Sequence, residues 1–198
     1  MASWPQVYLK LSSDTAKFKG ANRSVVQVSW EEAMEFCRRL SQHTKLFYTL
    51  PSEAQWEYAC RAGTTTPFAF GDMMMPSLAN YDHVYNGKFI IRLGPKGQYQ
   101  QKTVEVGCFP ANAWGLKDMN GNVWEWCLDH WHSNYRDAPS DGSAWVTGGE
   151  PTRRLLRGGS WRDSHRSCRL AARYWRHLDD RNDSIGFRLC RFPPGLTA

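Results

Sequence analysis

The stretch that decides the fold is RLLRGGSW at 154–161, followed by RDSHRSCRLAARYWRHLDDRNDS at 162–184 and IGFRLC at 185–190. The two ends are typical of a structural frame, because Gly158 and Gly159 form a turn after an apolar pair and 185–190 resembles a short apolar strand. The segment between them follows neither the period of a helix nor that of a strand. A rigid frame can carry almost any side chain on its surface. We therefore predict a ligand-binding region at 157–190, with the binding face at 162–184.

The composition predicts one domain over residues 1–198. With 198 residues, 41% of them hydrophobic and 14% aromatic, the chain can bury a sizeable core. The mean hydropathy of -0.60 and the lack of a long apolar run argue against a membrane span. No export signal is visible, so we expect a cytoplasmic monomer with reduced thiols. The six cysteines form no CxxC pair, which argues against a zinc site.

Positive charge is concentrated near the end of the chain. The net charge is +6, and residues 151–192 hold eleven arginines, four aspartates and no lysine. Such a cluster could bind phosphates or acidic surfaces. However, arginine without lysine favours internal bonds to carbonyls and carboxylates. We therefore do not expect nucleic acid as the partner.

Two helices and one strand can be placed from local signals. Ser29 with Glu32, and Ser52 with Gln55, are spaced as capping boxes that begin helices. The spacing predicts a buried face at Ala33, Cys37 and Leu40 in the first helix, and at Ala54, Tyr58 and Ala59 in the second. Residues 123–128 alternate as a strand, with Trp124 and Trp126 on one face and a polar face at Glu125 and Cys127. With loop-rich stretches at 64–110 and 133–152, this predicts an α+β fold of two helices, short antiparallel strands and long loops.

Four strings occur in an order that resembles the formylglycine-generating (sulfatase-modifying) enzyme superfamily. They are FKGANRSVVQVSWEEAMEFCRRLS, YTLPSEAQWEYACRAGT, NAWGLKDMNGNVWEWCLDHW, and RLLRGGSW with GFRL. The resemblance implies a variant of the C-type lectin fold, with the start of the domain lacking its usual first strand. Membership alone does not decide the activity, because one fold hosts several functions.

Two enzymatic activities are implied by the resemblance. Formylglycine-generating oxidases hold copper with two cysteines after the RGGS string, and counting from Arg157 places these positions at Asp163 and Cys168. Only Cys168 could supply a thiolate, and a two-thiolate Cu(I) site needs two. Iron-dependent sulfoxide synthases of the superfamily use three histidines on a separate helical domain, and the histidines here have no such spacing. We therefore expect a chain that is not an enzyme, with the copper oxidase as the alternative.

The segment at 162–184 resembles the variable region of C-type-lectin-fold proteins that are diversified by retroelements. In those proteins the varied residues lie between the RGGSW and IGFR strings. The resemblance implies a protein ligand, with Tyr174 and Trp175 as anchors, because aromatics dominate binding hot spots. The matching ligand-binding positions are Arg162, Asp163, Ser164, Arg166, Ser167, Leu170, Ala172, Tyr174, Trp175, Arg176, His177, Asp180, Asn182, Asp183 and Ser184.

A calcium ion is also implied by the resemblance, at the turn before the WEW strand. The matching ligands are the side chains of Asp118 and Glu125 and the carbonyls of Gly121 and Val123. Hard oxygen ligands on a tight turn suit calcium. The alternative is that Glu125 pairs with an arginine beneath the surface.

Overall fold

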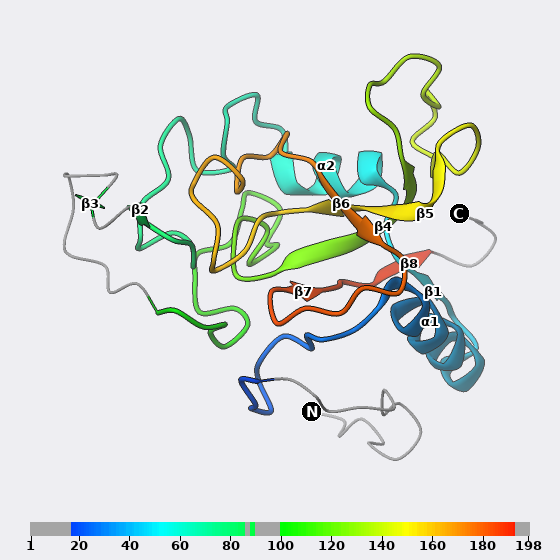
Figure 1. Cartoon of the computed structure of the whole chain (residues 1–198), viewed down its shortest axis with the longest axis horizontal. Coiled ribbons are helices and arrows are strands. Elements are labelled where there is room, and N and C mark those ends of the chain that lie inside the picture. The colour runs from blue at the N-terminus through cyan, green and yellow to red at the C-terminus, as the bar shows by residue number, and fades with distance from the viewer. Residues whose placement is uncertain (1–16, 86–87, 90–99, 193–198) are drawn as a thin grey trace.

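Two helices, short strands and long loops make up the part of the chain that the structure describes (Figure 1). The structure is a computed structural model, and it describes residues 17–85, 88–89 and 100–192. The predicted α+β class is confirmed. No helix among these residues is long and apolar enough to cross a bilayer.

Both predicted helix starts are confirmed. Helix α1 spans Trp30–Thr44 and α2 spans Glu53–Arg61. In α1 the Glu32 N–H donates to Ser29 Oγ at 3.2 Å, and the Ser29 N–H donates to Glu32 Oε2 at 3.0 Å. Ser52 and Gln55 make the same reciprocal pair at 3.1 and 3.0 Å. Each box satisfies donors that a helix N-terminus would otherwise leave free.

The buried face of α1 is as predicted, whereas the face predicted for α2 is wrong. Ala33, Cys37 and Leu40 are buried in α1. In α2, Tyr58 is 69% exposed, and the buried residues are Glu53, Trp56 and Cys60. A buried glutamate is tolerated here because distant partners neutralise and bond it, and no local pattern reveals such partners.

The main sheet has four strands in the order β6-β5-β4-β7. Strands β4 (Trp124–Trp131), β5 (Glu150–Arg157) and β6 (Tyr174–His177) pair antiparallel, and β7 (Ile185–Gly186) pairs parallel with β4. Two smaller sheets pair β1 (Phe47–Thr49) with β8 (Cys190–Phe192), and β2 (Val84–Tyr85) with β3 (Lys88–Phe89). In Figure 1, α1 lies beside β1 and β8, and α2 packs against β4 and β5. The apolar strand expected at 185–190 is thus divided between β7 and β8.

The strand at 123–128 is confirmed, but its predicted polar face is wrong. Glu125 is 5% exposed and Cys127 is fully buried. One face of β4 packs Trp126 against Leu156 and Val28, and the other places Cys127 in a second core cluster. A strand that is covered on both faces buries every side chain, so alternation of residue types does not give alternation of exposure.

The two-glycine turn after β5 positions the segment that follows it. Gly158 and Gly159 have φ angles of +98° and +75°, which side chains other than glycine rarely adopt. A Cβ on Gly159 would lie 2.6 Å from Cys168 Sγ. The turn therefore packs directly beneath Cys168, which fixes the loop that leads to β6.

Candidate functional site

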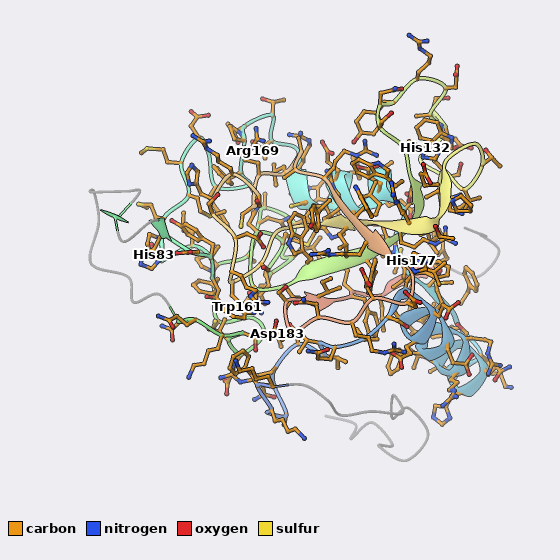
Figure 2. All side chains as sticks on the ribbon, viewed as in Figure 1. His83, His132, Trp161, Arg169, His177 and Asp183 are labelled. Atoms are coloured by element: carbon orange, nitrogen blue, oxygen red, sulfur yellow. The ribbon has the colours of Figure 1, made fainter. Side chains whose placement is uncertain are left out.

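A surface pocket of about 560 Å³ lies where β4, β6 and the segments 162–173 and 182–185 meet. We call it the arginine pocket, after its five arginines. In Figure 2, Trp161 and Asp183 lie close together, whereas Arg169 lies well apart from both. Residues 161–183 therefore extend over a broad area. The lining residues are Trp124, Arg162, Asp163, Arg166, Ser167, Arg169, Ala171, Ala172, Arg173, Tyr174, Arg176, Asn182, Ser184 and Ile185.

The structure brings nine of the fifteen predicted ligand-binding residues into this pocket. They are Arg162, Asp163, Arg166, Ser167, Ala172, Tyr174, Arg176, Asn182 and Ser184. The sequence reasoning missed Trp124, Arg169, Ala171, Arg173 and Ile185. Trp124 comes from β4, and only the pairing of β4 with β7 and the position of β6 bring it here.

Strand β6 separates the two predicted anchors. Tyr174 stacks on Trp124, with ring centroids 5.4 Å apart and planes at 29°. Trp175 instead contacts Trp131 and lies under the guanidinium of Arg153 at 4.0 Å. Successive side chains of a strand point to opposite faces. Tyr174 therefore lines the pocket and Trp175 does not. The role of Trp175 as a ligand anchor stays a prediction.

Several other predicted residues lie outside the pocket. Leu170 is fully buried in a core cluster and its carbonyl accepts from Arg157 at 2.6 Å, so its prediction as a surface residue is wrong. Asp183 is 9% exposed and pairs with Arg162 at 2.9 Å. His177 pairs with Asp179 at 2.5 Å. Ser164 and Asp180 are also absent from the lining.

Arg173 is fixed in the pocket wall by three hydrogen bonds to two residues. Its Nε and Nη2 donate to the two oxygens of Glu53 at 2.7 and 2.9 Å, and its Nη1 donates to the His132 carbonyl at 2.9 Å. In Figure 2, His132 and Trp161 lie toward opposite ends of the paired strands β4 and β5. Glu53 also accepts from Arg157 and from the Tyr135 hydroxyl. This network joins α2, β5 and the loop before β6 into one rigid wall.

Asp163 is the acidic residue of the pocket. Its Oδ2 accepts from the Trp124 indole at 2.9 Å and from the Ser160 hydroxyl. Its Oδ1 receives no donor among the described residues. The carboxylate is therefore held in one orientation through Oδ2.

The described residues do not fit a two-thiolate copper site. Asp163 stands at the first cysteine position, and Cys168 is fully buried beneath Gly159. Burial, and to a lesser extent Asp163, raise the pKa of the Cys168 thiol far above its usual value, which disfavours a thiolate ligand. No group of three or more His, Cys, Asp or Glu side chains suited to a metal occurs in the described ranges.

The residues predicted to hold calcium fit the ion only in part. Both oxygens of Glu125 already accept from Arg188, and Oε2 also accepts from the Trp56 indole at 2.6 Å. Asp118 Oδ1 is buried and accepts no hydrogen bond, which is expected for an oxygen that binds a cation or a water. Burial raises the pKa of Asp118. Gly121 cannot bear a side chain, because a Cβ would lie 2.4 Å from the Asn80 carbonyl oxygen. Calcium binding stays a prediction.

Comparisons with known proteins agree on one family. Residues 8–192 match the model of the sulfatase-modifying factor enzyme 1-like domain. A formylglycine-generating enzyme of Mycobacterium tuberculosis is 37% identical over 186 residues, which cover 87% of this chain and 58% of that protein. The chain spans about half the length of the curated relatives it matches.

Solved structures share the fold. PvdO from Pseudomonas aeruginosa has a TM-score of 0.75 and 34% identity, with 88% of this chain and 64% of that chain covered. Treponema denticola variable protein 1 has a TM-score of 0.72 over 90% of this chain and 77% of that chain. Its 24% identity supports the fold alone. These findings confirm the predicted C-type lectin fold of the formylglycine-generating-enzyme type.

The expectation that the chain is not an enzyme is overturned by these comparisons. Four relatives that are 30 to 37% identical are named formylglycine-generating enzymes. The expectation relied on the replacement of one cysteine by Asp163. The loss of one ligand position argues against one kind of metal centre, and it does not argue against catalysis by other groups.

Proposed function

The chain belongs to the family of the sulfatase-modifying factor enzyme 1-like domain, and from that membership we propose that it is an enzyme that recognises a polypeptide segment in the arginine pocket. The observation that carries the proposal is the convergence of nine predicted binding residues on one pocket with an aromatic floor. Its volume of about 560 Å³ falls in the range of pockets that bind small ligands or single side chains of a partner. The family description refers to factors that modify sulfatases, which are themselves polypeptides.

Asp163 is the group in this pocket that we propose to act on the substrate. Trp124 and Ser160 orient its carboxylate through Oδ2. Oδ1 is left to accept a proton from a donor group of the bound segment. A base fixed in this way needs no reorganisation when the substrate binds.

Selection of short random peptides on the immobilised chain tests the proposed binding site. Peptides enriched on the wild type should lose binding when Tyr174 and Arg176 are both replaced by alanine. The matched control replaces Trp175 and His177, which point to the opposite face of the same strand. Enriched peptides that tolerate the first variant as well as the second would contradict the pocket as the recognition site.

Mass spectrometry of a selected peptide after incubation in air tests the proposed chemistry. With dioxygen as the oxidant, which takes up the electrons, and Asp163 as the base that takes up the released proton, the wild type should oxidise a group of the bound peptide and so change the mass of the peptide. Asp163→Asn should slow that change by about a hundredfold or more, the size expected for loss of a general base. Binding of the peptide to Asp163→Asn, measured by anisotropy, should persist. An unchanged rate in this variant would remove Asp163 from the mechanism.

Diversification of the pocket by a retroelement is a further part of the proposal. Residues such as Arg166, Tyr174 and Arg176 can vary without disturbing the core, because they are exposed or half-exposed and belong to none of the core clusters. Leu170 cannot vary in this way. A template repeat and a reverse transcriptase gene in the flanking DNA would support diversification, and their absence would count against it.

A further inference from the structure

A second pocket of different character adjoins the arginine pocket. This second pocket has a volume of about 470 Å³ and lies between α2 and the loop that joins β4 to β5. We call it the apolar pocket, after the side chains of Tyr58, Pro139 and Trp145 in its wall. Ala171 lines both pockets. Its side chain is exposed and small, so a ligand can pass from one pocket to the other over it.

Three arginines of the arginine pocket have no acidic partner. Arg166, Arg169 and Arg176 make no ion pair with a carboxylate among the described residues. The other two arginines in the lining are neutralised, because Arg162 pairs with Asp183 and Arg173 with Glu53. Arginines that face one hollow repel each other unless an anion lies between them. A bound carboxylate or phosphate would be that anion, since the guanidinium fork matches both groups.

The charged groups of the apolar pocket, in contrast, already have partners. Glu57 pairs with Arg61 at 2.7 Å and also with Arg157. Asp129 accepts from the backbone N–H groups of Glu53 and Trp145 at 2.7 and 2.9 Å. What this pocket offers a ligand is therefore its apolar surface. The aromatic surface extends onto Tyr58, whose ring packs edge-on against Trp114 at 4.9 Å.

We infer that a polypeptide segment binds across Ala171, with an acidic side chain in the arginine pocket and an apolar side chain in the apolar pocket. The inference names the substrate class for the proposed function and rests on it. Charge complementarity selects the acidic group, and the second pocket selects an apolar group a few residues away. Affinity should arise from both contacts at once, because linking two weak contacts makes the second one intramolecular.

Fluorescence anisotropy with three labelled peptides tests the inference. The first peptide carries two glutamates and, a few residues away, a phenylalanine. The second has glutamines in place of the glutamates, and the third has serine in place of the phenylalanine. The wild-type chain should bind the first peptide about tenfold more tightly than either of the others. Added salt should weaken the first and third peptides more than the second.

Ala171→Trp should lower the affinity for the first peptide about tenfold, because the indole fills the passage between the pockets. Ala21→Trp is the matched control, since Ala21 is exposed and lines neither pocket. Arg166→Gln with Arg176→Gln should remove the preference for glutamate over glutamine. These changes at exposed or half-exposed positions should leave the unfolding midpoint unchanged, which a thermal melt checks.

Equal binding of the three peptides, or an Ala171→Trp variant that binds the first peptide normally, would overturn the inference. Other peptides could bind the wild type and lose that binding when Tyr174 and Arg176 are replaced. In that case the inference would fail while the proposed function stood. If no peptide bound and dodecanoate alone occupied both pockets, the inference and the proposed function would fail together.

Discussion

Glu125 and Arg188 form a two-point ion pair, with Arg188 Nε 2.5 Å from Glu125 Oε2 and Nη2 2.7 Å from Oε1. Glu125 is the second residue of β4 and is 5% exposed. Its third donor is the Trp56 indole of α2. Glu125 therefore joins α2, β4 and the segment before β8 at a single buried point.

Loss of the Glu125 charge should destabilise the fold. Glu125→Gln leaves the guanidinium of Arg188 without its counter-charge, and breaking a buried pair costs about 3 kcal/mol after allowance for the partial exposure of the arginine. Urea unfolding should show this loss. Glu35→Gln is the control, because Glu35 pairs with Arg38 and Arg39 on the exposed surface of α1, where the loss of an ion pair should change the stability little. Similar losses of stability for both variants would contradict the role of Glu125 in joining α2, β4 and the segment before β8.

Calcium should act through Asp118 if it binds at the predicted turn. A ligand that binds only the native state raises the unfolding midpoint by mass action. We expect a higher midpoint in millimolar calcium than in chelator, and Asp118→Asn should remove the difference. Glu125→Gln should lower the midpoint equally in both solutions, because its oxygens already bond Arg188. Equal midpoints for the wild type in calcium and in chelator would eliminate the ion site.

The segment 162–184 should divide into residues that hold the fold and residues that do not. Leu170→Ala should cost about 2–5 kcal/mol, the usual range for a leucine buried in a core. Ser164→Ala with His177→Ala should cost less than about 1 kcal/mol in total, because both side chains lie at or near the surface. Denaturant melts measure both. Equal costs would mean that the whole segment is structural.

Local signals predicted the helix starts, and non-local partners explain the errors. The capping boxes at Ser29 and Ser52 use residues three positions apart, so the sequence displays them directly. The buried face of α2 depends on Glu53, which pairs with Arg157 across 104 positions. No periodicity within α2 can reveal that partner. Tyr58 was therefore expected inside, although it is exposed.

The sequence indicated where a surface segment lies, but it did not indicate the pocket that the segment helps to form. Polar variety between two framing strings correctly indicated a surface, and nine of its residues line the arginine pocket. The pocket floor needs Trp124 from β4, and the wall needs Arg173 held by Glu53. Strand β6 then turns Tyr174 inward and Trp175 away. These features arise from strand pairing, which a single irregular segment does not encode.

Thiol labelling should separate the six cysteines by burial. All six are free, and Cys37, Cys60, Cys127 and Cys168 are buried while Cys108 is exposed. Burial raises the pKa of Cys37 to about 12, so almost no thiolate exists there at pH 8. Burial also raises the pKa values of Cys60, Cys127 and Cys168.

An alkylating reagent at pH 8 should therefore modify Cys108 first and the half-buried Cys190 more slowly. The four buried thiols should react only after denaturant is added, because the reagent needs both access and a thiolate. Peptide mapping by mass spectrometry identifies each site. Cys108→Ser should remove the fast phase and leave the unfolding midpoint unchanged, which separates reactivity from stability. Fast labelling of Cys168 in the native chain would show that the Gly159 turn does not shield this thiol from the reagent. A functional role for the Cys168 thiolate near the arginine pocket would then have to be considered again.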